Sequence, residues 1–323
     1  MTRWLSAADV AELLTPKVAL AAVGSALEWS RLGTTQVPGR ERLQHDGTVL
    51  LSMRASGDAG IAEKVLTLSA NRANSDRPTI QGVLLIFDGR TGSLRGVLDG
   101  GSVTAIRTAA IASWATARLA PADASQMLLV GAGAQARWQV EAILSVRPIQ
   151  RVSVWNRTEA RAVALVSVLA EHHPDVAFAV ARDLHAAARA ADVITLVTAS
   201  HDPILELSDL PGSCHINAMG AHDPHARELA SDIMATADVY ADTVKGCLDE
   251  AGDVLIPIAE GLLEPQHLQP LADADTRHSG LTVMKSVGSA LFDLACGAAV
   301  LDTVDQLAVG SGAGLKLALG PDS

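Results

Sequence analysis

Residues 127–158, MLLVGAGAQARWQVEAILSVRPIQRVSVWNRT, carry the plainest fold signal of the chain. The apolar run MLLV leads into a glycine-rich turn, a segment with helical spacing and a second apolar run, RVSVW. Such alternation of strands and helices is typical of a parallel, doubly wound sheet with helices on both faces. The stretch therefore predicts a Rossmann-type α/β fold.

The glycine-rich turn matches the GxGxxA form of the dinucleotide fingerprint. Gly131 permits the tight turn, Gly133 lets backbone amides approach a pyrophosphate, and Ala136 is small enough for the helix to pack on the strand. The next strand ends at Asn156, 25 residues after Gly131, which is the expected βαβ spacing. The sequence therefore predicts a bound nicotinamide dinucleotide.

The end of that second strand indicates which dinucleotide is bound. An acidic residue there would bind the ribose 2′-hydroxyl of NAD, but the sequence is Asn156-Arg157-Thr158. An amide, a guanidinium and a hydroxyl suit the 2′-phosphate of NADP. NADP(H) is therefore favoured and NAD(H) stays possible, since Arg157 on a solvated turn would leave the preference open.

The sequence before this stretch has a different texture. Thr15-Pro16 begins a helix that ends at Gly33, and the alanine-rich run TAIRTAAIASWATARLA is a second helix. Between them, from Val37 to about Leu98, β-prone runs such as TVLLSM and GVLLIFD are separated by turn residues. This texture predicts an antiparallel sheet.

These elements indicate two domains with a boundary near Pro121. We place the first domain at 1–120 and a Rossmann NAD(P)-binding domain at 121–294, with a C-terminal helix at about 295–323 that returns to the first domain. The strands expected in the Rossmann domain are Met127–Val130, Val152–Trp155, Val193–Thr198, His215–Met219 and Val239–Ala241.

Composition excludes several classes of function. The chain has 323 residues, 49% of them hydrophobic and 19% charged, which suits two folded domains. A net charge of −11 disfavours nucleic-acid binding, which needs a clustered basic surface. Apolar runs are interrupted well before about 18 residues. Because the N-terminus MTRWLSAADVAELL also lacks an apolar signal core, we expect a cytoplasmic protein with no membrane partner.

Neither the cysteines nor the histidines form a metal-binding pattern. Cys214, Cys247 and Cys296 are far apart and are predicted to be buried free thiols. His172-His173 has no partner ligands at helical spacing, so no metal site is expected.

Several separated stretches resemble the ornithine cyclodeaminase and mu-crystallin family. They are LDGGSVTAIRTAA, GAGAQAR, VWNRT, HINAMGAHDPHAREL and TVMKSVGSALFD. The resemblance implies that the first domain binds substrate and forms a homodimer, and that the chemistry interconverts amino, imino and oxo acids. WNRT and HINA resemble the NADPH-binding mu-crystallin side of the family most.

The resemblance also implies a substrate site. Arg40, Lys64 and Arg107 resemble the family residues that surround the substrate carboxylate. Their chemistry suits this role, because a guanidinium donates two parallel hydrogen bonds to a carboxylate and a lysine adds a charge and a transferable proton. Arg42 competes with Arg40, since it lies two residues away on the same strand face. Each cation alone could instead form a surface ion pair.

The sequence departs from the family at two positions. The cyclodeaminases have a catalytic aspartate where this chain has His222, and Asp223 is one residue too late. His222 could donate a proton or merely pack at the cofactor edge. Arg54 replaces a proline of many relatives and would hold a second carboxylate, as on iminosuccinate, unless it is solvent-exposed.

The candidate cofactor contacts extend beyond the glycine-rich turn to other matching stretches. They are Thr79, Arg107, Thr108, Gly131, Gly133, Ala134, Gln135, Asn156, Arg157, Thr158, Thr198, Ala218, Met219, Gly220 and Ser286.

Three functions remain open from the sequence. The first is an NAD(P)H-dependent reductase of an α-imino acid, such as pyrroline-2-carboxylate or iminosuccinate, with Lys64 or His222 as the proton donor; in reverse it is an amino-acid dehydrogenase. The second is an ornithine or lysine cyclodeaminase with tightly held NAD, against which the missing aspartate counts. The third is a crystallin-like protein that binds NADPH without turnover.

Overall fold

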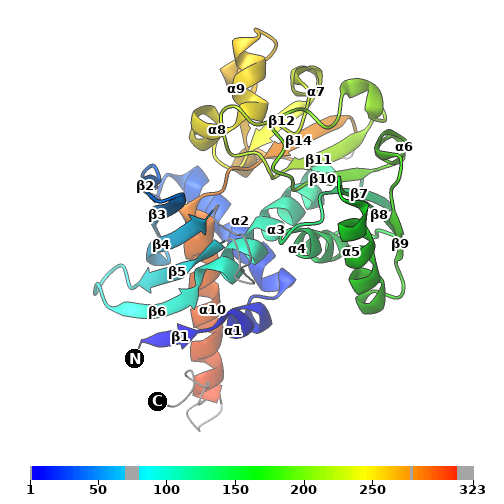
Figure 1. Cartoon of the computed structure of the whole chain (residues 1–323). Coiled ribbons are helices and arrows are strands. Elements are labelled where there is room, and N and C mark those ends of the chain that lie inside the picture. Colours follow the sequence, from blue (N-terminus) through cyan, green and yellow to red (C-terminus); the bar gives the residue numbers. More distant parts are fainter. Residues whose placement is uncertain (1, 70–79, 277–278, 311–323) are drawn as a thin grey trace. The chain divides into compact units, whose positions relative to one another are not determined.

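The computed structural model describes residues 2–69, 80–276 and 279–310, and the chain forms two compact units. The first unit comprises residues 1–107 and 289–323, and the second comprises residues 108–288 (Figure 1). The expected boundary near Pro121 marks the end of helix α3 (Gly100–Leu119), whereas the division lies inside this helix. The boundary between the two units precedes Pro121, because the first turns of α3 belong to the first unit. Thr104 contacts its sheet and Arg107 contacts its last helix.

Within the described residues, the first unit has a six-stranded sheet in the order β1-β6-β5-β4-β3-β2. The strands are β1 (Arg3–Leu5), β2 (Glu41–His45), β3 (Thr48–Gly57), β4 (Gly60–Ser69), β5 (Ile80–Phe87) and β6 (Leu94–Asp99). All neighbours are antiparallel except β1 and β6, so the antiparallel sheet predicted before Leu98 is confirmed.

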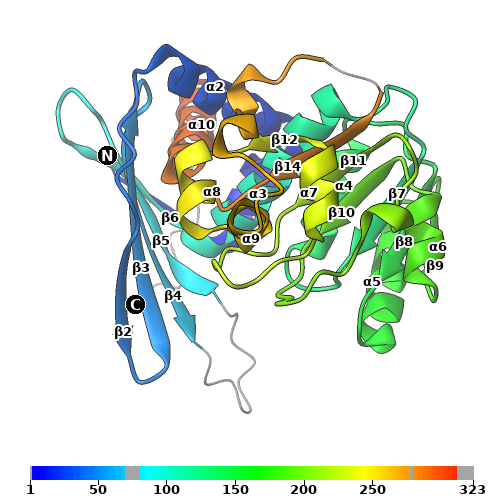
Figure 2. The ribbon, with the colours of Figure 1, turned by 90° about the horizontal axis from the view of Figure 1, so that it is seen from above.

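Helix α10 (Ala290–Gly310) covers one face of this sheet, and helix α2 (Pro16–Leu32) packs on α10. The sheet contacts of α10 are with β3, β4 and β5, as Figure 2 shows. Helix α2 has the predicted ends, because the Thr15 side chain accepts the Val18 N–H and Gly33 adopts a left-handed conformation. The shorter helix α1 (Ala7–Leu13) begins with a capping box at Ser6. The alternate residues of β4 that face α10 are buried and form the core of this unit.

The second unit is built on a parallel sheet, which has eight strands in the part of the chain that the structure describes. Their order is β13-β12-β14-β11-β10-β7-β8-β9. The strands are β7 (Gln126–Val130), β8 (Arg151–Trp155), β9 (Ala177–Val180), β10 (Val193–Leu196), β11 (Cys214–Ala218), β12 (Asp238–Ala241), β13 (Gln269–Pro270) and β14 (Leu281–Lys285). From β7 the chain continues to β8 and β9 on one side of the sheet and then returns to β10 on the other side. In Rossmann sheets ligands bind at such a switch point, outside the carboxyl ends of the strands, here those of β7 and β10.

Helices pack on both faces of the second sheet, as predicted. Along β7, Leu129 belongs to one apolar cluster with α4 and α5, whereas Leu128 belongs to another with α6, α7, α8 and α9. The helices are α4 (Ala136–Leu144), α5 (Glu159–His172), α6 (Leu184–Arg189), α7 (Ser231–Thr236), α8 (Val244–Glu250) and α9 (Gly252–Ala259). Short 3-10 turns are η1 (Leu207–Asp209), η2 (Pro265–His267) and η3 (Leu271–Asp273).

The three cysteines are buried and free, which confirms their predicted state. No group of His, Cys, Asp and Glu side chains in the described residues is arranged to hold a metal ion. Across the same residues, no single helix is long and apolar enough to span a membrane; only the bent pair of α1 with α2 reaches that length and apolar composition.

Candidate active site

The first unit buries a group of charged side chains between its sheet and its helices. Lys64, on the covered face of β4, is 1% exposed, and its Nζ lies 2.6 Å from Oδ2 of Asp293 in α10. Nζ also lies 3.2 Å from Oγ1 of Thr104 in α3. Arg107, one helical turn after Thr104, places Nε 3.1 Å from the other Asp293 oxygen. One fully buried carboxylate therefore holds both a lysine and an arginine.

The surroundings of Lys64 make its proton labile. Burial lowers the pKa of Lys64, and the charges of Arg107 and Arg40 lower it further, against the opposing effect of Asp293, so that it reaches about 8. Burial alone would raise the pKa of Asp293, but Lys64 and Arg107 outweigh burial and hold that pKa below its usual value. Lys64 can therefore exchange a proton near neutral pH while Asp293 stays ionised.

Arg40 is the arginine of the β2 region that is electrostatically coupled to Lys64. It lies just before β2, is partly exposed, and helps to lower the pKa of Lys64. Arg42 pairs in register with Leu51 of β3 and is exposed. The structure therefore favours Arg40 over Arg42 as a member of the site.

Arg54 is not brought to this group. Met53 of β3 pairs directly with Lys64 of β4, and paired residues share a face of the sheet. Arg54 follows Met53, so its side chain points to the opposite face, where it is exposed and forms an ion pair with Glu41. Of the two alternatives for Arg54, the structure therefore supports solvent exposure over a second-carboxylate contact beside Lys64, because the alternation of the strand turns its side chain away.

Asp293 is the site residue that the sequence reasoning missed. It stands in the first turn of α10, within the otherwise apolar run ALFDLACGAAV, and is fully buried. The signal that could have revealed it is an isolated aspartate in an apolar helical stretch, since buried carboxylates are almost always paired.

The glycine-rich turn of the second unit fits a dinucleotide. It joins β7 to α4 at the switch point of the sheet, and Gly131 has a φ of 109°. A Cβ on Gly131 would lie 2.9 Å from the Val197 carbonyl oxygen, whereas the Cβ position of Gly133 has no atom within 4 Å. Ala136 is fully buried at the start of α4. The backbone thus leaves open space at Gly133, beside a helix N-terminus, where a pyrophosphate would bind.

The turn after β8 carries three polar side chains, of which two are exposed. The Asn156 amide is used within the protein, because its Oδ1 accepts the Ala132 N–H at 3.0 Å and its Nδ2 donates to the Thr158 carbonyl at 2.9 Å. Arg157 and Thr158 are exposed, and the Thr158 hydroxyl does not cap α5. Arg157 and Thr158, rather than Asn156, are therefore available to a ligand.

The other candidate cofactor contacts have different positions. Thr198, Ala218, Met219, Gly220 and Ser286 lie at or just after the carboxyl ends of the adjacent strands β10, β11 and β14.

The remaining candidates lie at or near helices, or outside the described residues. Ala134 is exposed and Gln135 precedes α4 with its Oε1 buried. Arg107 belongs to the buried group of the first unit, Thr108 begins the second unit, and Thr79 lies outside the described residues.

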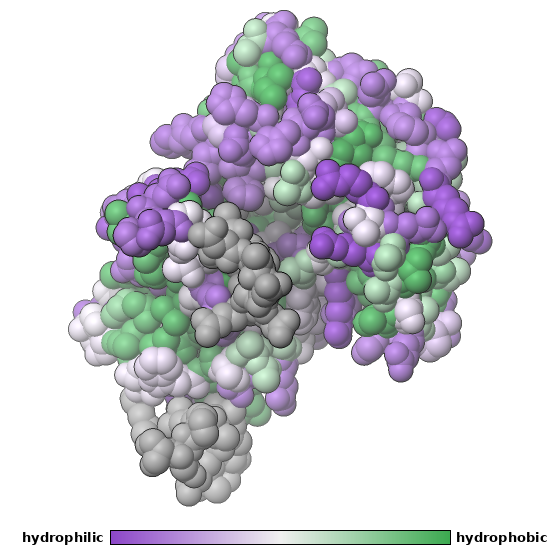
Figure 3. All heavy atoms as spheres, viewed as in Figure 1, coloured by the Kyte–Doolittle hydropathy of each residue, from purple (hydrophilic) through white to green (hydrophobic). Residues whose placement is uncertain are grey.

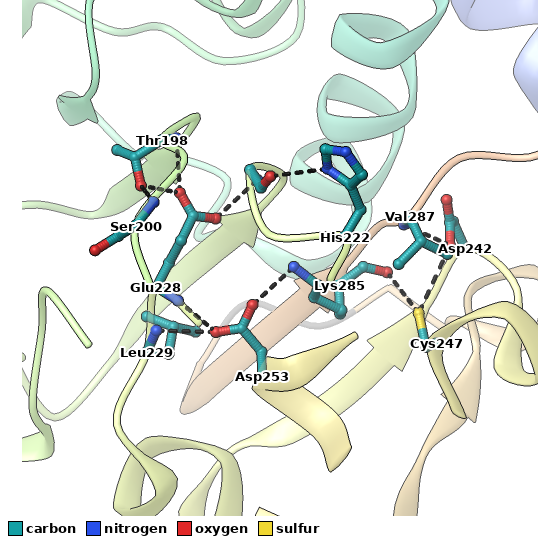
Figure 4. A network of polar contacts seen from close by, with 11 residues as sticks. Thr198, Ser200, His222, Glu228, Leu229, Asp242, Cys247, Asp253, Lys285 and Val287 are labelled. Atoms are coloured by element: carbon teal, nitrogen blue, oxygen red, sulfur yellow. Dashed lines mark hydrogen bonds and ion pairs between the residues drawn. The ribbon is translucent and has the colours of Figure 1, made fainter. Parts of the chain in front are cut away.

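A buried network of charges joins these strand ends (Figure 4). Glu228 Oε1 accepts hydrogen bonds from the Thr198 N–H and hydroxyl, both at 2.8 Å, and Oε2 accepts the Gly220 N–H at 2.7 Å. Asp253 pairs with Lys285 at 2.8 Å, and all three charged residues are fully buried. Burial raises the pKa of Glu228. Burial opposes the charge on Lys285, but the carboxylates of Asp253 and Glu228 outweigh it and raise the pKa of Lys285.

His222 stands beside this network. Its Nδ1 lies 3.1 Å from the Gly220 carbonyl oxygen, and the side chain is exposed. Asp223, the neighbouring carboxylate, accepts the His225 N–H at 2.8 Å and is also exposed. The Asp223 carboxylate therefore stabilises a local turn.

Comparison with known proteins supports the same family. The chain is 30% identical over 305 residues to a Delta(1)-pyrroline-2-carboxylate reductase of Bacillus cereus, covering 90% of this chain and 93% of that protein. It is 34% identical over 256 residues to ketimine reductase mu-crystallin of Mus musculus, covering 79% of each.

A solved structure has the same fold over nearly the whole chain. It is Thermococcus litoralis Delta(1)-pyrroline-2-carboxylate reductase in complex with NADH and L-proline, with a TM-score of 0.89 and 26% identity over 97% of this chain and 99% of that one. The family model of ornithine cyclodeaminase and mu-crystallin matches residues 2–306. The chain therefore belongs to the ornithine cyclodeaminase/mu-crystallin family.

Proposed function

We propose that this protein is an NAD(P)H-dependent reductase of α-imino acids, with cyclic ketimines such as pyrroline-2-carboxylate as the leading substrates. The buried group of Lys64, Asp293 and Arg107 carries this proposal, because it combines a labile proton with a carboxylate-binding cation. The names of the two relatives, both imine reductases, support it. The reverse reaction would be an amino-acid dehydrogenation.

Arg107 and Arg40 are assigned to the substrate carboxylate. Among the described residues, Arg107 bonds Asp293 through Nε, which leaves its Nη groups for a second carboxylate. A guanidinium that donates two parallel hydrogen bonds holds a carboxylate in a fixed orientation. Arg40 adds positive charge next to Lys64.

Lys64 is assigned to the proton on the imine nitrogen. A bound reduced nicotinamide supplies the hydride, and the imine carbon accepts it readily only when the nitrogen is protonated. Lys64 Nζ is fixed between Asp293 and Thr104, and a pKa of about 8 keeps it mostly protonated at pH 7 yet able to release a proton. We prefer Lys64 over His222, because His222 is exposed and is oriented by the Gly220 carbonyl.

The test is oxidation of NADPH or NADH, followed at the absorbance band of the reduced nicotinamide. The panel contains pyrroline-2-carboxylate and a six-membered cyclic ketimine, oxo acids with ammonia or methylamine, and oxaloacetate with ammonia. We expect the cyclic ketimines to be the best substrates. Ammonia release from ornithine or lysine without net cofactor oxidation would replace the reductase by a cyclodeaminase, and cofactor binding without turnover would indicate a crystallin-like protein.

We propose NADPH as the preferred cofactor. The exposed Arg157 and Thr158 at the start of α5 support this choice, because a guanidinium and a helix N-terminus both attract a phosphate. The ratio of kcat/KM values for NADPH and NADH tests it, and a preference for NADH would overturn it.

We also propose a homodimer formed through the uncovered face of the first sheet. Leu43, Ile61 and Val83 share this face and are 68%, 44% and 38% exposed. Figure 3 shows hydrophobic surface over the first unit, in the region of β5 and β6. Light scattering should give twice the mass of the chain, and Ile61→Glu should reduce it to the monomer value; a monomeric wild-type protein would contradict this assignment.

A further inference from the structure

Glu228 connects two loops that follow adjacent strands. One carboxylate oxygen accepts two hydrogen bonds from Thr198, after β10, and the other accepts the Gly220 N–H, after β11. Each oxygen thus serves one loop, as Figure 4 shows. Removal of the second acceptor oxygen would release one of the two loops.

Further contacts fix Glu228 itself. Asp253 Oδ1 accepts the backbone N–H groups of Glu228 and Leu229 at 2.8 and 2.9 Å, and Oδ2 pairs with Lys285, the last residue of β14. The network therefore joins the carboxyl ends of three neighbouring strands, β10, β11 and β14.

Both backbone polar groups of Gly220 have partners within the protein. Its N–H donates to Glu228, and its carbonyl oxygen lies 3.1 Å from His222 Nδ1. A Cβ at this position would lie 2.0 Å from the Thr198 carbonyl oxygen and 2.5 Å from Glu228 Oε1, so only glycine allows this approach. At Gly220 the two loops are therefore in close backbone contact.

The burial of these charges costs more folding free energy than is needed merely to hold two loops together. Two buried carboxylates lie in the field of one buried lysine, which pairs directly with Asp253, and burial of a charge without full compensation is unfavourable. A neutral side chain would join two loops at a lower cost. The location supplies a reason, because the half of a Rossmann sheet beyond the switch point receives the second mononucleotide of the cofactor.

We propose that Glu228 is a positioning residue for the nicotinamide half of the dinucleotide, acting by locking the loops after β10 and β11 in one geometry. This inference rests on the dinucleotide site of the proposed function but not on the reaction. Glu228 acts through Thr198 and Gly220, and the adenosine half, on the side of β7 and β8, should not sense it.

The experiment compares whole cofactors with their adenosine fragments. Calorimetric Kd values are measured for NADPH and 2′,5′-ADP, and in parallel for NADH and ADP, with wild type, Glu228→Gln and Glu171→Gln. In Glu228→Gln, the amide nitrogen cannot accept one of the loop N–H groups. We expect the Kd of the whole dinucleotide to rise about tenfold or more, since a charge-assisted hydrogen bond is lost. The fragment should change less than about twofold, within the usual independence of separated sites.

Glu171, exposed near the end of α5, is the matched control and should change neither Kd. If Glu228→Gln does not fold, Glu228→Asp, which keeps the charge but shortens the reach, takes its place with the same expectation. Equal weakening of dinucleotide and fragment, or no weakening, would overturn the positioning role. If the wild-type protein bound neither dinucleotide, this result would instead contradict the dinucleotide site and the proposed function with it.

Discussion

Lys64 and Lys285 are both fully buried and both paired with a buried aspartate, but their surroundings move their pKa values in opposite directions. Burial lowers the pKa of Lys64, which shares Asp293 with Arg107 and lies near Arg40, to about 8. Burial acts on Lys285 as well, but Asp253 and the nearby charge of Glu228 raise its pKa above the ordinary value. The number of cations that share one carboxylate, rather than burial alone, distinguishes a labile lysine from a permanently charged one.

The two lysines also contribute to stability with opposite signs. The pKa of Lys64 is about 8 in the folded chain and 10.5 in the unfolded chain, so between these pH values the unfolded chain binds more protons. The charge on Lys64 therefore lowers the free energy of unfolding fully below pH 8, and this cost disappears as the pH rises to 10.5. Lys285 contributes stability that is present below pH 10.5 and is lost as the pH rises through its raised pKa. Lys64 thus resembles a functional group held at a cost, and Lys285 a structural one.

Lys64→Met should have the largest effect on activity. We expect kcat/KM for ketimine reduction to fall by about 10²–10⁴-fold, the usual contribution of a positioned proton donor. Lys245→Met is the control, because Lys245 is 85% exposed and pairs with Asp249 on the surface of α8. If Lys64→Met kept most of its activity in steady-state assays at pH 7, the role of proton donor would be assigned to His222 instead.

Lys285→Met should have the largest effect on stability. The change leaves Asp253 and Glu228 buried without their cation, so the free energy of unfolding in urea should fall by about 3–5 kcal/mol. Lys64→Met should lower it far less, because Asp293 keeps its contact with Arg107. Equal destabilisation by the two substitutions would show that the two pairs are equivalent.

Asp293→Asn should shift the pH profile of the reaction. Reduction requires a protonated Lys64, so log kcat/KM should decrease above about pH 8. Asp293 is the group that raises the pKa of Lys64 against burial, Arg107 and Arg40, so its removal should move the alkaline limb to lower pH. Burial raises the pKa of the nearby Cys296 thiol to about 12, which keeps this group neutral throughout.

The matched control for this profile is Asp302→Asn on the same helix, since Asp302 is 60% exposed and pairs with Arg95. Use of one substrate for all three proteins cancels the titration of the imine itself. An unchanged alkaline limb in Asp293→Asn would contradict the tuning of Lys64 by Asp293.

Arg157→Ala should have the smallest effect and should leave both lysine pairs intact. We expect the preference for NADPH over NADH to fall by about tenfold, the value of one charge-assisted contact to phosphate. Ketimine kcat with saturating cofactor should stay close to wild type. A loss of kcat instead of selectivity would show that Arg157 acts on the fold of the glycine-rich turn.

Local signals in the sequence predicted five of the eight described strands of the second unit, because strand, glycine turn and helix are neighbours along the chain; β9, β13 and β14 were not among them. Lys64 and Arg107 became candidates through the family resemblance, and not through local signals. Asp293 was missed because it is 186 residues from Arg107, and no local spacing reveals such a pair. The sequence left Arg54 open between a substrate contact and solvent exposure, because its face relative to Lys64 depends on the register of β3 and β4.

Glu228 was missed for a related reason. Its role depends on two loops that are brought together only by the parallel order of β10 and β11. The cytoplasmic location, the homodimer and the preference for NADPH stay predictions, since each depends on partners or surroundings outside the folded chain.

Whether this fold reduces an imine is decided by the product balance of one reaction. Purified protein is incubated with pyrroline-2-carboxylate and NADPH, and proline and NADP⁺ are quantified over time. We predict equal amounts of both products, formed at a rate that Lys64→Met lowers by about a hundredfold or more. Absence of proline under these conditions, together with proline and ammonia formed from ornithine at constant NADPH, would contradict the reductase.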